Sequence, residues 1–150
     1  MAHQQTILVP IANTPASISA VNIACTVAKA RKSKLYVVHV IEVLRTLPLN
    51  AELQSEARRG DQVLRRAEEV ATQAGYHISA ELLQAREAGQ AIVDEARDRN
   101  VDTIIMGIGN RPIIGEFQLG RTAQFVLKHS GCDVWLVRPG EDHDGGEGEE

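Results

Sequence analysis

A glycine-rich stretch near residue 110 has the residue types that bind phosphate groups. Glycines let backbone amides approach a phosphate closely, and a helix N-terminus adds N–H donors and a favourable dipole. Arginine and threonine side chains would add further donors to the phosphate oxygens. The alternative is that the glycines only serve turns and a helix cap, because neither GxGxxG nor GxxxxGK[ST] is present. The candidate residues are Gly107, Gly109, Asn110, Arg111, Gly120, Arg121 and Thr122.

Two further strand ends are expected to border the same site. Residues 11–14 (IANT) follow the first expected strand, and Val40 lies near the end of the second. In open parallel sheets, ligands bind beyond the carboxyl ends of the strands, where the strand order reverses. We therefore include Ala12, Asn13 and Val40 among the candidate ligand-binding residues. Capping of the following helix by Asn13 or Thr14 is the simpler role for these two side chains.

The other reactive side chains do not form a recognisable catalytic or metal-binding set. The acidic residues are spread over different elements, and no GxSxG elbow accompanies the serines. His39 lies inside an apolar strand, where a hydrogen-bonded core residue is more common than a ligand. Cys25 and Cys132 lack CxxC spacing and are expected to pack as small hydrophobic residues in a reducing compartment. We therefore predict no catalytic residue, no metal ligand and no enzyme activity.

Length and composition predict one domain with an aliphatic core. The chain has 150 residues, of which 43% are hydrophobic and 3% aromatic, with a net charge of -4. Six acidic residues lie in the last ten, so we expect a domain over residues 1–139 and a disordered, acidic, glycine-rich tail over residues 140–150. Without a long apolar segment, a signal sequence or a basic patch, we expect a cytoplasmic protein that neither inserts into membranes nor binds nucleic acid.

The hydrophobic periodicity predicts five strands that alternate with four helices. Short apolar runs are typical of buried parallel strands, and helical spacing of apolar residues marks the segments between them. The expected strands are Thr6–Pro10, Lys34–Ile41, Tyr76–Leu83 (an edge strand), Asp102–Met106 and Cys132–Val137. The expected helices are Pro15–Arg31, Ala51–Ala74, Gly89–Arg99 and Leu119–His129. This order predicts an α/β fold, a five-stranded parallel doubly wound sheet of Rossmann-like type with helices on both faces.

The long helix expected over residues 51–74 has a strongly charged face. Arginines and glutamates recur on it at spacings that bring opposite charges together on a helix surface. The simplest interpretation is a solvated face held by ion pairs between residues about one turn apart. The residues concerned are Arg58, Arg59, Arg65, Arg66, Glu68 and Glu69.

The last expected strand is the candidate contact of a homodimer. An apolar strand at the edge of a sheet leaves unpaired backbone groups that favour association with a second chain. Pairing of this strand with its copy would cover that edge. The predicted interface residues are Asp133, Val134, Trp135, Leu136 and Val137.

Several separated blocks of sequence resemble the universal stress protein (UspA-like) family. They are the opening ILVP, the strand KLYVVHVIE, the segment EAGQAIVDEARDRNVDTIIMG and the ending LGRTAQFVLKHSGCDVWLVRP. The similarity covers residues 5–139. It implies a five-stranded α/β fold of the adenine nucleotide alpha hydrolase-like type, commonly a homodimer through the last strands. Some members of this family bind ATP or another adenine nucleotide, and others do not.

The sequence departs from the pattern of the nucleotide-binding members. Those members have an acidic residue where Ala12 stands, and a Gly-x-x-Gly-(nine residues)-Gly-Ser/Thr motif after the fourth strand. Gly107 and Gly120 match the first and third glycines, whereas Asn110 replaces the second and Arg121 replaces the serine or threonine. The resemblance is therefore to the subgroup that lacks an intact ATP-binding motif. Arg121 adds a cation at a helix N-terminus, where it opposes the dipole or clamps an anion from the side.

The resemblance implies a non-enzymatic regulatory or stress-response protein with a degenerate nucleotide pocket. The alternative is a sensor that binds ATP or another adenine nucleotide, which would be its only expected cofactor. The variant loop and the LGRT ending also resemble universal stress protein domains associated with transporters. This weaker resemblance implies a soluble regulator that acts on a transporter as its protein partner.

Overall fold

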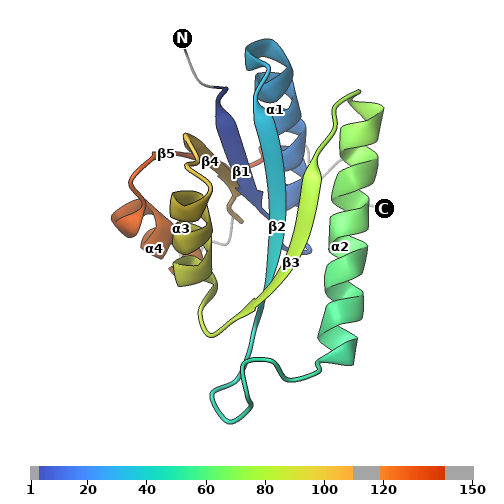
Figure 1. Cartoon of the computed structure of the whole chain (residues 1–150). Helices are drawn as coiled ribbons and strands as arrows, with labels where there is room; N and C mark the ends of the chain where they lie inside the picture. Colours follow the sequence, from blue (N-terminus) through green and yellow to red (C-terminus); the bar gives the residue numbers. More distant parts are fainter. Residues whose placement is uncertain (1–3, 110–118, 141–150) are drawn as a thin grey trace.

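The computed structural model describes residues 4–109 and 119–140, which form a five-stranded parallel sheet with helices on both faces (Figure 1). The strands are β1 (Thr6–Pro10), β2 (Lys34–Glu42), β3 (Ser79–Ala85), β4 (Thr103–Gly107) and β5 (Asp133–Val137). The helices are α1 (Pro15–Arg31), α2 (Gln54–Gln73), α3 (Ala88–Asp98) and α4 (Arg121–His129). The predicted doubly wound α/β fold is confirmed.

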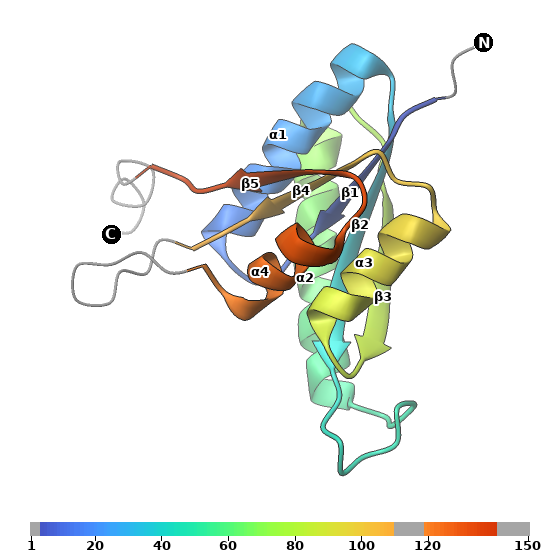
Figure 2. The same ribbon diagram turned by 90° about the vertical axis from the view of Figure 1, so that its left-hand side faces the viewer.

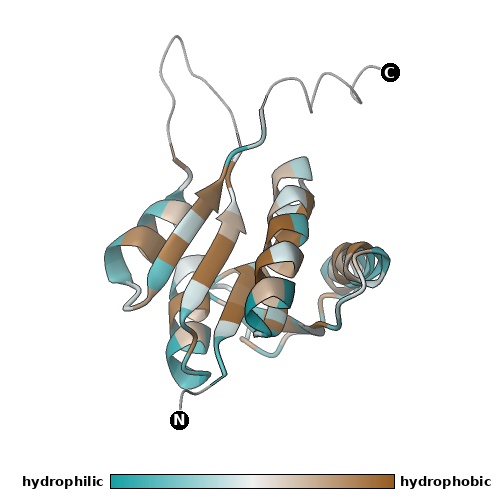
Figure 3. Cartoon of the chain, turned by 90° about the horizontal axis from the view of Figure 1, so that it is seen from above, coloured by the Kyte–Doolittle hydropathy of each residue, from teal (hydrophilic) through white to brown (hydrophobic). Residues whose placement is uncertain are grey.

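The strands are apolar on both sides because helices cover both sides of the sheet. Successive side chains of a strand point to opposite faces. Ile7 and Val9 pack beneath α1 and α2, whereas Leu8 and Val38 pack beneath α3 and α4, the side that faces the viewer in Figure 2. Figure 3 shows the strands coloured largely as hydrophobic. This two-sided burial explains why the strands appear in the sequence as continuous apolar runs.

The long helix begins later than predicted, at Gln54 instead of Ala51. The side-chain amide of Gln84, in β3, donates hydrogen bonds to the carbonyl oxygens of Leu49 (2.9 Å) and Ala51 (3.2 Å). These bonds tie residues 49–51 to the edge of the sheet, so the helix starts only beyond them. The end of the helix is as predicted, because Gly75 follows it with a φ of +76°.

The third strand is displaced from its predicted range of residues 76–83 and spans Ser79–Ala85. Tyr76 belongs to the turn after α2: its N–H donates to the Ala71 carbonyl at 2.9 Å, and its hydroxyl donates to the Ser33 carbonyl. The strand lies at one edge of the sheet, as predicted. The other predicted boundaries agree with the structure to within two residues.

The strand order is β3-β2-β1-β4-β5, so the order reverses between β1 and β4. In the register of these two strands, Leu8 lies opposite Ile104. The loops that follow β1 and β4 therefore leave the sheet side by side, at the position where ligands bind in doubly wound folds. β5 forms the other edge of the sheet and pairs with β4.

Three of the predictions concern residues outside the described part of the chain. Asn110 and Arg111 lie in the gap after Gly109, and the acidic tail lies beyond Gly140. The domain boundary after residue 139 stays a prediction. Among the described helices, none is both long and apolar enough to span a membrane.

Candidate functional site

Hydrogen bonds centred on Ser17 hold the loop after β1. Its Oγ accepts from the Ala12 N–H at 2.8 Å and from the Thr14 hydroxyl at 3.2 Å, and its own N–H donates to Thr14 Oγ1 at 3.1 Å. Thr14 is therefore the N-cap of α1, one of the two predicted candidates. Ala12 and Asn13 are exposed beside it. The loop is ordered by its own polar groups and presents no charged side chain.

His39 supports the same loop from β2. Its Nδ1 lies 2.8 Å from the carbonyl oxygen of Ile11, and because a carbonyl can only accept, Nδ1 carries the hydrogen. The predicted hydrogen bond of His39 is thus present, although the residue is half-buried and does not belong to the core. Its neighbour Val40 points to the opposite face of the sheet and packs with the core beneath α3 and α4. In the register of β1 and β2, Pro10 pairs with Val38, so the loop that begins with Ile11 and Ala12 leaves the sheet beside the end of β2, where Val40 lies.

Gly107, at the end of β4, allows close packing between the sheet and α1. A Cβ atom at this position would lie 2.8 Å from the Ser17 nitrogen and nearer still to the carbonyl group of Ala16. By contrast, a Cβ atom at Gly109 or Gly120 would have no heavy atom of the described residues within 4 Å. Helix packing alone thus accounts for Gly107, and its presence is no evidence of phosphate binding.

Glu42, at the end of β2, contacts the starts of two helices. Its Oε2 accepts from the N–H of Ala88, the first residue of α3, at 2.8 Å, and its Oε1 lies 3.8 Å from the guanidinium group of Arg121. Arg121 begins α4, and its side chain is 88% exposed. The carboxylate thereby satisfies the N-terminus of α3 and offsets the unfavourable position of Arg121 at the N-terminus of α4. Nothing in the sequence near Glu42 indicates this role, because both of its partners lie far along the chain.

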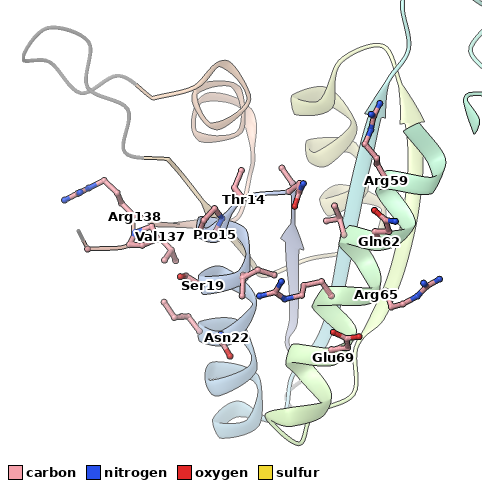
Figure 4. Close-up of a pocket in the computed structure, with 18 residues that line it drawn as sticks. Thr14, Pro15, Ser19, Asn22, Arg59, Gln62, Arg65, Glu69, Val137 and Arg138 are labelled. Atoms are coloured by element: carbon pink, nitrogen blue, oxygen red, sulfur yellow. The ribbon is translucent and has the colours of Figure 1, made fainter. Parts of the chain in front are cut away.

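A groove with a volume of about 1120 Å³ lies between α1 and α2 (Figure 4). The loop after β1 and residues 137–140 complete its lining. Figure 4 shows Ser19 and Asn22 on α1, with Gln62 and Glu69 across from them on α2. The structure brings only part of the predicted site to this groove, namely Ala12 and Asn13. The predicted residues that do not line it are Val40, Gly107, Gly109, Gly120, Arg121 and Thr122.

Arginines give this groove its charge. Arg59, Arg65 and Arg66 of α2 line it together with Arg138, which follows β5. The prediction of ion pairs along this face of α2 was wrong, because no ion pair within α2 occurs among the described residues. The spacing of Arg59 and Arg66, two helical turns apart, could have indicated a basic stripe. Arg138 adds a fourth positive charge to the lining of the groove only because the fold brings the end of β5 near α1.

The two cysteines are buried or half-buried, as expected of packing residues. Burial raises the pKa of the Cys25 thiol, and burial together with the nearby charge of Asp133 raises that of Cys132. Both thiols therefore stay protonated at neutral pH. Within residues 4–109 and 119–140, no three His, Cys, Asp or Glu side chains gather as the ligands of a metal ion would.

Comparison with known proteins identifies the family. The sequence profile of the universal stress protein family matches residues 4–138. The chain belongs to the universal stress protein family. It is 28% identical to a universal stress protein of Methanocaldococcus jannaschii over 138 residues, 88% of this chain and 81% of the relative. It is 34% identical to one from Thermus aquaticus over 115 residues, 74% of this chain and 82% of the relative.

Solved structures of universal stress proteins share the fold. The protein UspA of Lactobacillus plantarum has a TM-score of 0.73 at 22% identity, with 92% of this chain and 100% of that chain covered. An Archaeoglobus fulgidus protein in complex with dAMP has a TM-score of 0.70 at 18% identity, with 91% and 99% covered. A third, in complex with cAMP, has a TM-score of 0.69 at 23% identity, with 93% and 100% covered. These similarities support the fold.

Proposed function

We propose that this universal stress protein is a non-enzymatic regulatory or stress-response protein whose nucleotide pocket is degenerate. The observation that carries the proposal is the loop after β1. Nucleotide-binding members have an acidic side chain at the position of Ala12, whereas this loop presents a methyl group and its backbone N–H is already bonded to Ser17. A ligand therefore meets no carboxylate here for its ribose, its base or an associated metal ion.

The N-termini of α3 and α4 support the same proposal. A helix N-terminus binds phosphate through free N–H groups and a positive dipole. At α3, the carboxylate of Glu42 already accepts a hydrogen bond from the first backbone N–H group. At α4, the first residue is Arg121, whose guanidinium group lies 3.8 Å from the same carboxylate. A phosphate group bound to Arg121 would lie near the carboxylate of Glu42, which carries a like charge.

We expect the purified protein to contain no nucleotide and to give no measurable heat when titrated with ATP. The measurements are mass spectrometry of small molecules released from freshly purified protein and calorimetry with Mg-ATP. A ligand at one hundred times its dissociation constant would stabilise the fold by about 2.7 kcal/mol, so thermal unfolding with ATP provides an independent check. An adenine nucleotide that co-purifies with the protein would contradict the proposal.

A sensor that binds an adenine nucleotide is the second candidate function. Its support is that two proteins of the same fold were solved in complex with dAMP and with cAMP. This function would use the backbone near Gly107 and Gly120 in place of the missing carboxylate. A thermal-unfolding panel of ATP, AMP, cAMP and cyclic dinucleotides distinguishes the candidates, because only the sensor is stabilised by one of these ligands.

We infer that the protein forms a homodimer through β5. This strand is an edge of the sheet, and its residues 134–137 are only half-buried in the single chain. A second copy that pairs along this edge would cover their exposed surface and satisfy the open backbone groups.

Val134→Lys or Trp135→Lys is expected to shift the protein from dimer to monomer in analytical ultracentrifugation, because a lysine at the edge places a desolvated charge in the contact. Leu127→Lys is the matched control, since Leu127 lies on α4 and is 44% exposed. Circular dichroism must show that each variant is folded. If both β5 variants sediment as the unsubstituted dimer does, the interface lies elsewhere.

A further inference from the structure

The groove between α1 and α2 has an excess of positive charge that the described residues do not neutralise. Four arginines, Arg59, Arg65, Arg66 and Arg138, line it together with one carboxylate, that of Glu69. Within residues 4–109 and 119–140, none of these four guanidinium groups forms an ion pair or a hydrogen bond. Figure 4 shows that Arg65 and Arg138 line the groove at its outer sides, with their guanidinium groups pointing outward. Charges of one sign along a groove raise the local potential, which favours an anionic partner.

The chain supplies an anionic segment at this groove. Gly140 lines the groove, and residues 141–150 (EDHDGGEGEE) follow it with six acidic residues and no lysine or arginine. Ten extended residues reach up to about 33 Å, whereas Arg59 and Arg66 are separated by about 10 Å along the helix axis. The tail is therefore long enough to pass along the arginines of α2, and its three glycines let it follow the groove.

We propose that the acidic tail, residues 141–150, binds in the arginine-lined groove of its own chain. Its covalent attachment keeps the carboxylates at an effective concentration in the millimolar range, so several individually weak ion pairs are sufficient. The bound tail lies beside Ala12 and Asn13, and any other anion that enters the groove has to displace it. This contact goes beyond the proposed function and does not depend on whether a nucleotide binds.

The test compares the full chain with a full-length variant whose tail carries no charge, E141Q/D142N/D144N/E147Q/E149Q/E150Q. In ¹H–¹⁵N NMR spectra, the substitutions are expected to shift the amide signals of Ser19, Asn22 and Gln62 and the side-chain Nε signals of Arg59 and Arg66. Signals from α3 and α4 serve as internal references and are expected to stay in place. The difference in the positions of the groove signals between the two proteins should fall by about half or more when NaCl is raised from 0.1 to 1 M. The reason is that the electrostatic screening length falls from about 10 to 3 Å.

Two arginine variants of the full chain provide a matched comparison. Arg66→Gln removes a guanidinium group from the groove, whereas Arg58→Gln removes one from the same helix at an exposed position outside the groove. We expect Arg66→Gln to move the tail amide signals toward their positions in a free peptide of the same sequence, and Arg58→Gln to leave them unchanged. Both side chains are exposed, so neither substitution is expected to impair folding.

Three outcomes would overturn the proposal. The first is a neutral-tail variant whose groove signals coincide with those of the unsubstituted chain. The second is an equal response of the tail to Arg58→Gln and Arg66→Gln. The third is a difference that is lost in the Trp135→Lys background, which is expected to be monomeric; this would assign the groove to the tail of the second copy in the dimer. None of these outcomes bears on ATP binding, so the two proposals succeed or fail separately.

Discussion

Replacement of Gly107 by alanine is expected to destabilise the protein by about 2–3 kcal/mol. The added Cβ atom would meet the carbonyl group of Ala16 and the nitrogen of Ser17, all backbone atoms of the first turn of α1. A side chain could rotate away from such a contact, but these atoms cannot, so α1 has to move away from β4. That movement would also disturb Ser17, whose hydroxyl holds the loop after β1. Urea unfolding followed by circular dichroism measures the effect.

Gly109→Ala is the matched control for this prediction. It is the same substitution two residues further along the chain, where a Cβ atom would have no heavy atom of the described residues within 4 Å and φ is not positive. We expect a change of less than about 0.5 kcal/mol in the free energy of unfolding. Equal losses of stability in the two variants would show that the contact with α1 is not what requires glycine at position 107.

The largest functional effect is expected from restoring the nucleotide-binding pattern. We predict that the triple variant Ala12→Asp, Asn110→Gly, Arg121→Ser binds ATP at least about a hundredfold more tightly than the unsubstituted chain, equivalent to about 2.7 kcal/mol. The aspartate supplies an acceptor at an exposed position, where it fits without moving the Ser17 hydrogen bond. The serine adds a hydroxyl and removes the cation that opposes the helix dipole. Calorimetry with Mg-ATP is the measurement.

A variant with an uncharged side chain at position 12 distinguishes the effect of the carboxylate charge on ATP binding from the effect of side-chain size. With Ala12→Asn in place of Ala12→Asp, the side chain keeps its size and loses its carboxylate, so a hydrogen bond to a charged group is replaced by a weaker neutral one. We expect this control to recover only part of the affinity. If the triple variant binds ATP no better than the unsubstituted chain, the three departures from the pattern are not the cause of a degenerate pocket.

The order and type of the elements could be predicted from the sequence because their signals are local. Residues 6–10 are continuously apolar, as a strand covered on both faces must be, and Thr14 with Pro15 marks the start of α1. Gly75 similarly marks the end of α2. Where a distant residue competes for the backbone, the prediction was wrong. Gln84 bonds to the backbone ahead of α2, and Tyr76, whose hydroxyl donates to the Ser33 carbonyl, stays in the turn before β3.

The sequence by itself also determined the family. The departures that we propose at Ala12, Asn110 and Arg121 likewise depend only on residue type and spacing. What the candidate residues do was decided by the tertiary structure. Gly107 meets α1 some ninety positions earlier in the chain, Glu42 reaches Arg121, and Arg138 joins the arginines of α2 in one groove. Each of these contacts arises because the doubly wound sheet brings strand ends together from distant parts of the chain. No local pattern of residues records that proximity.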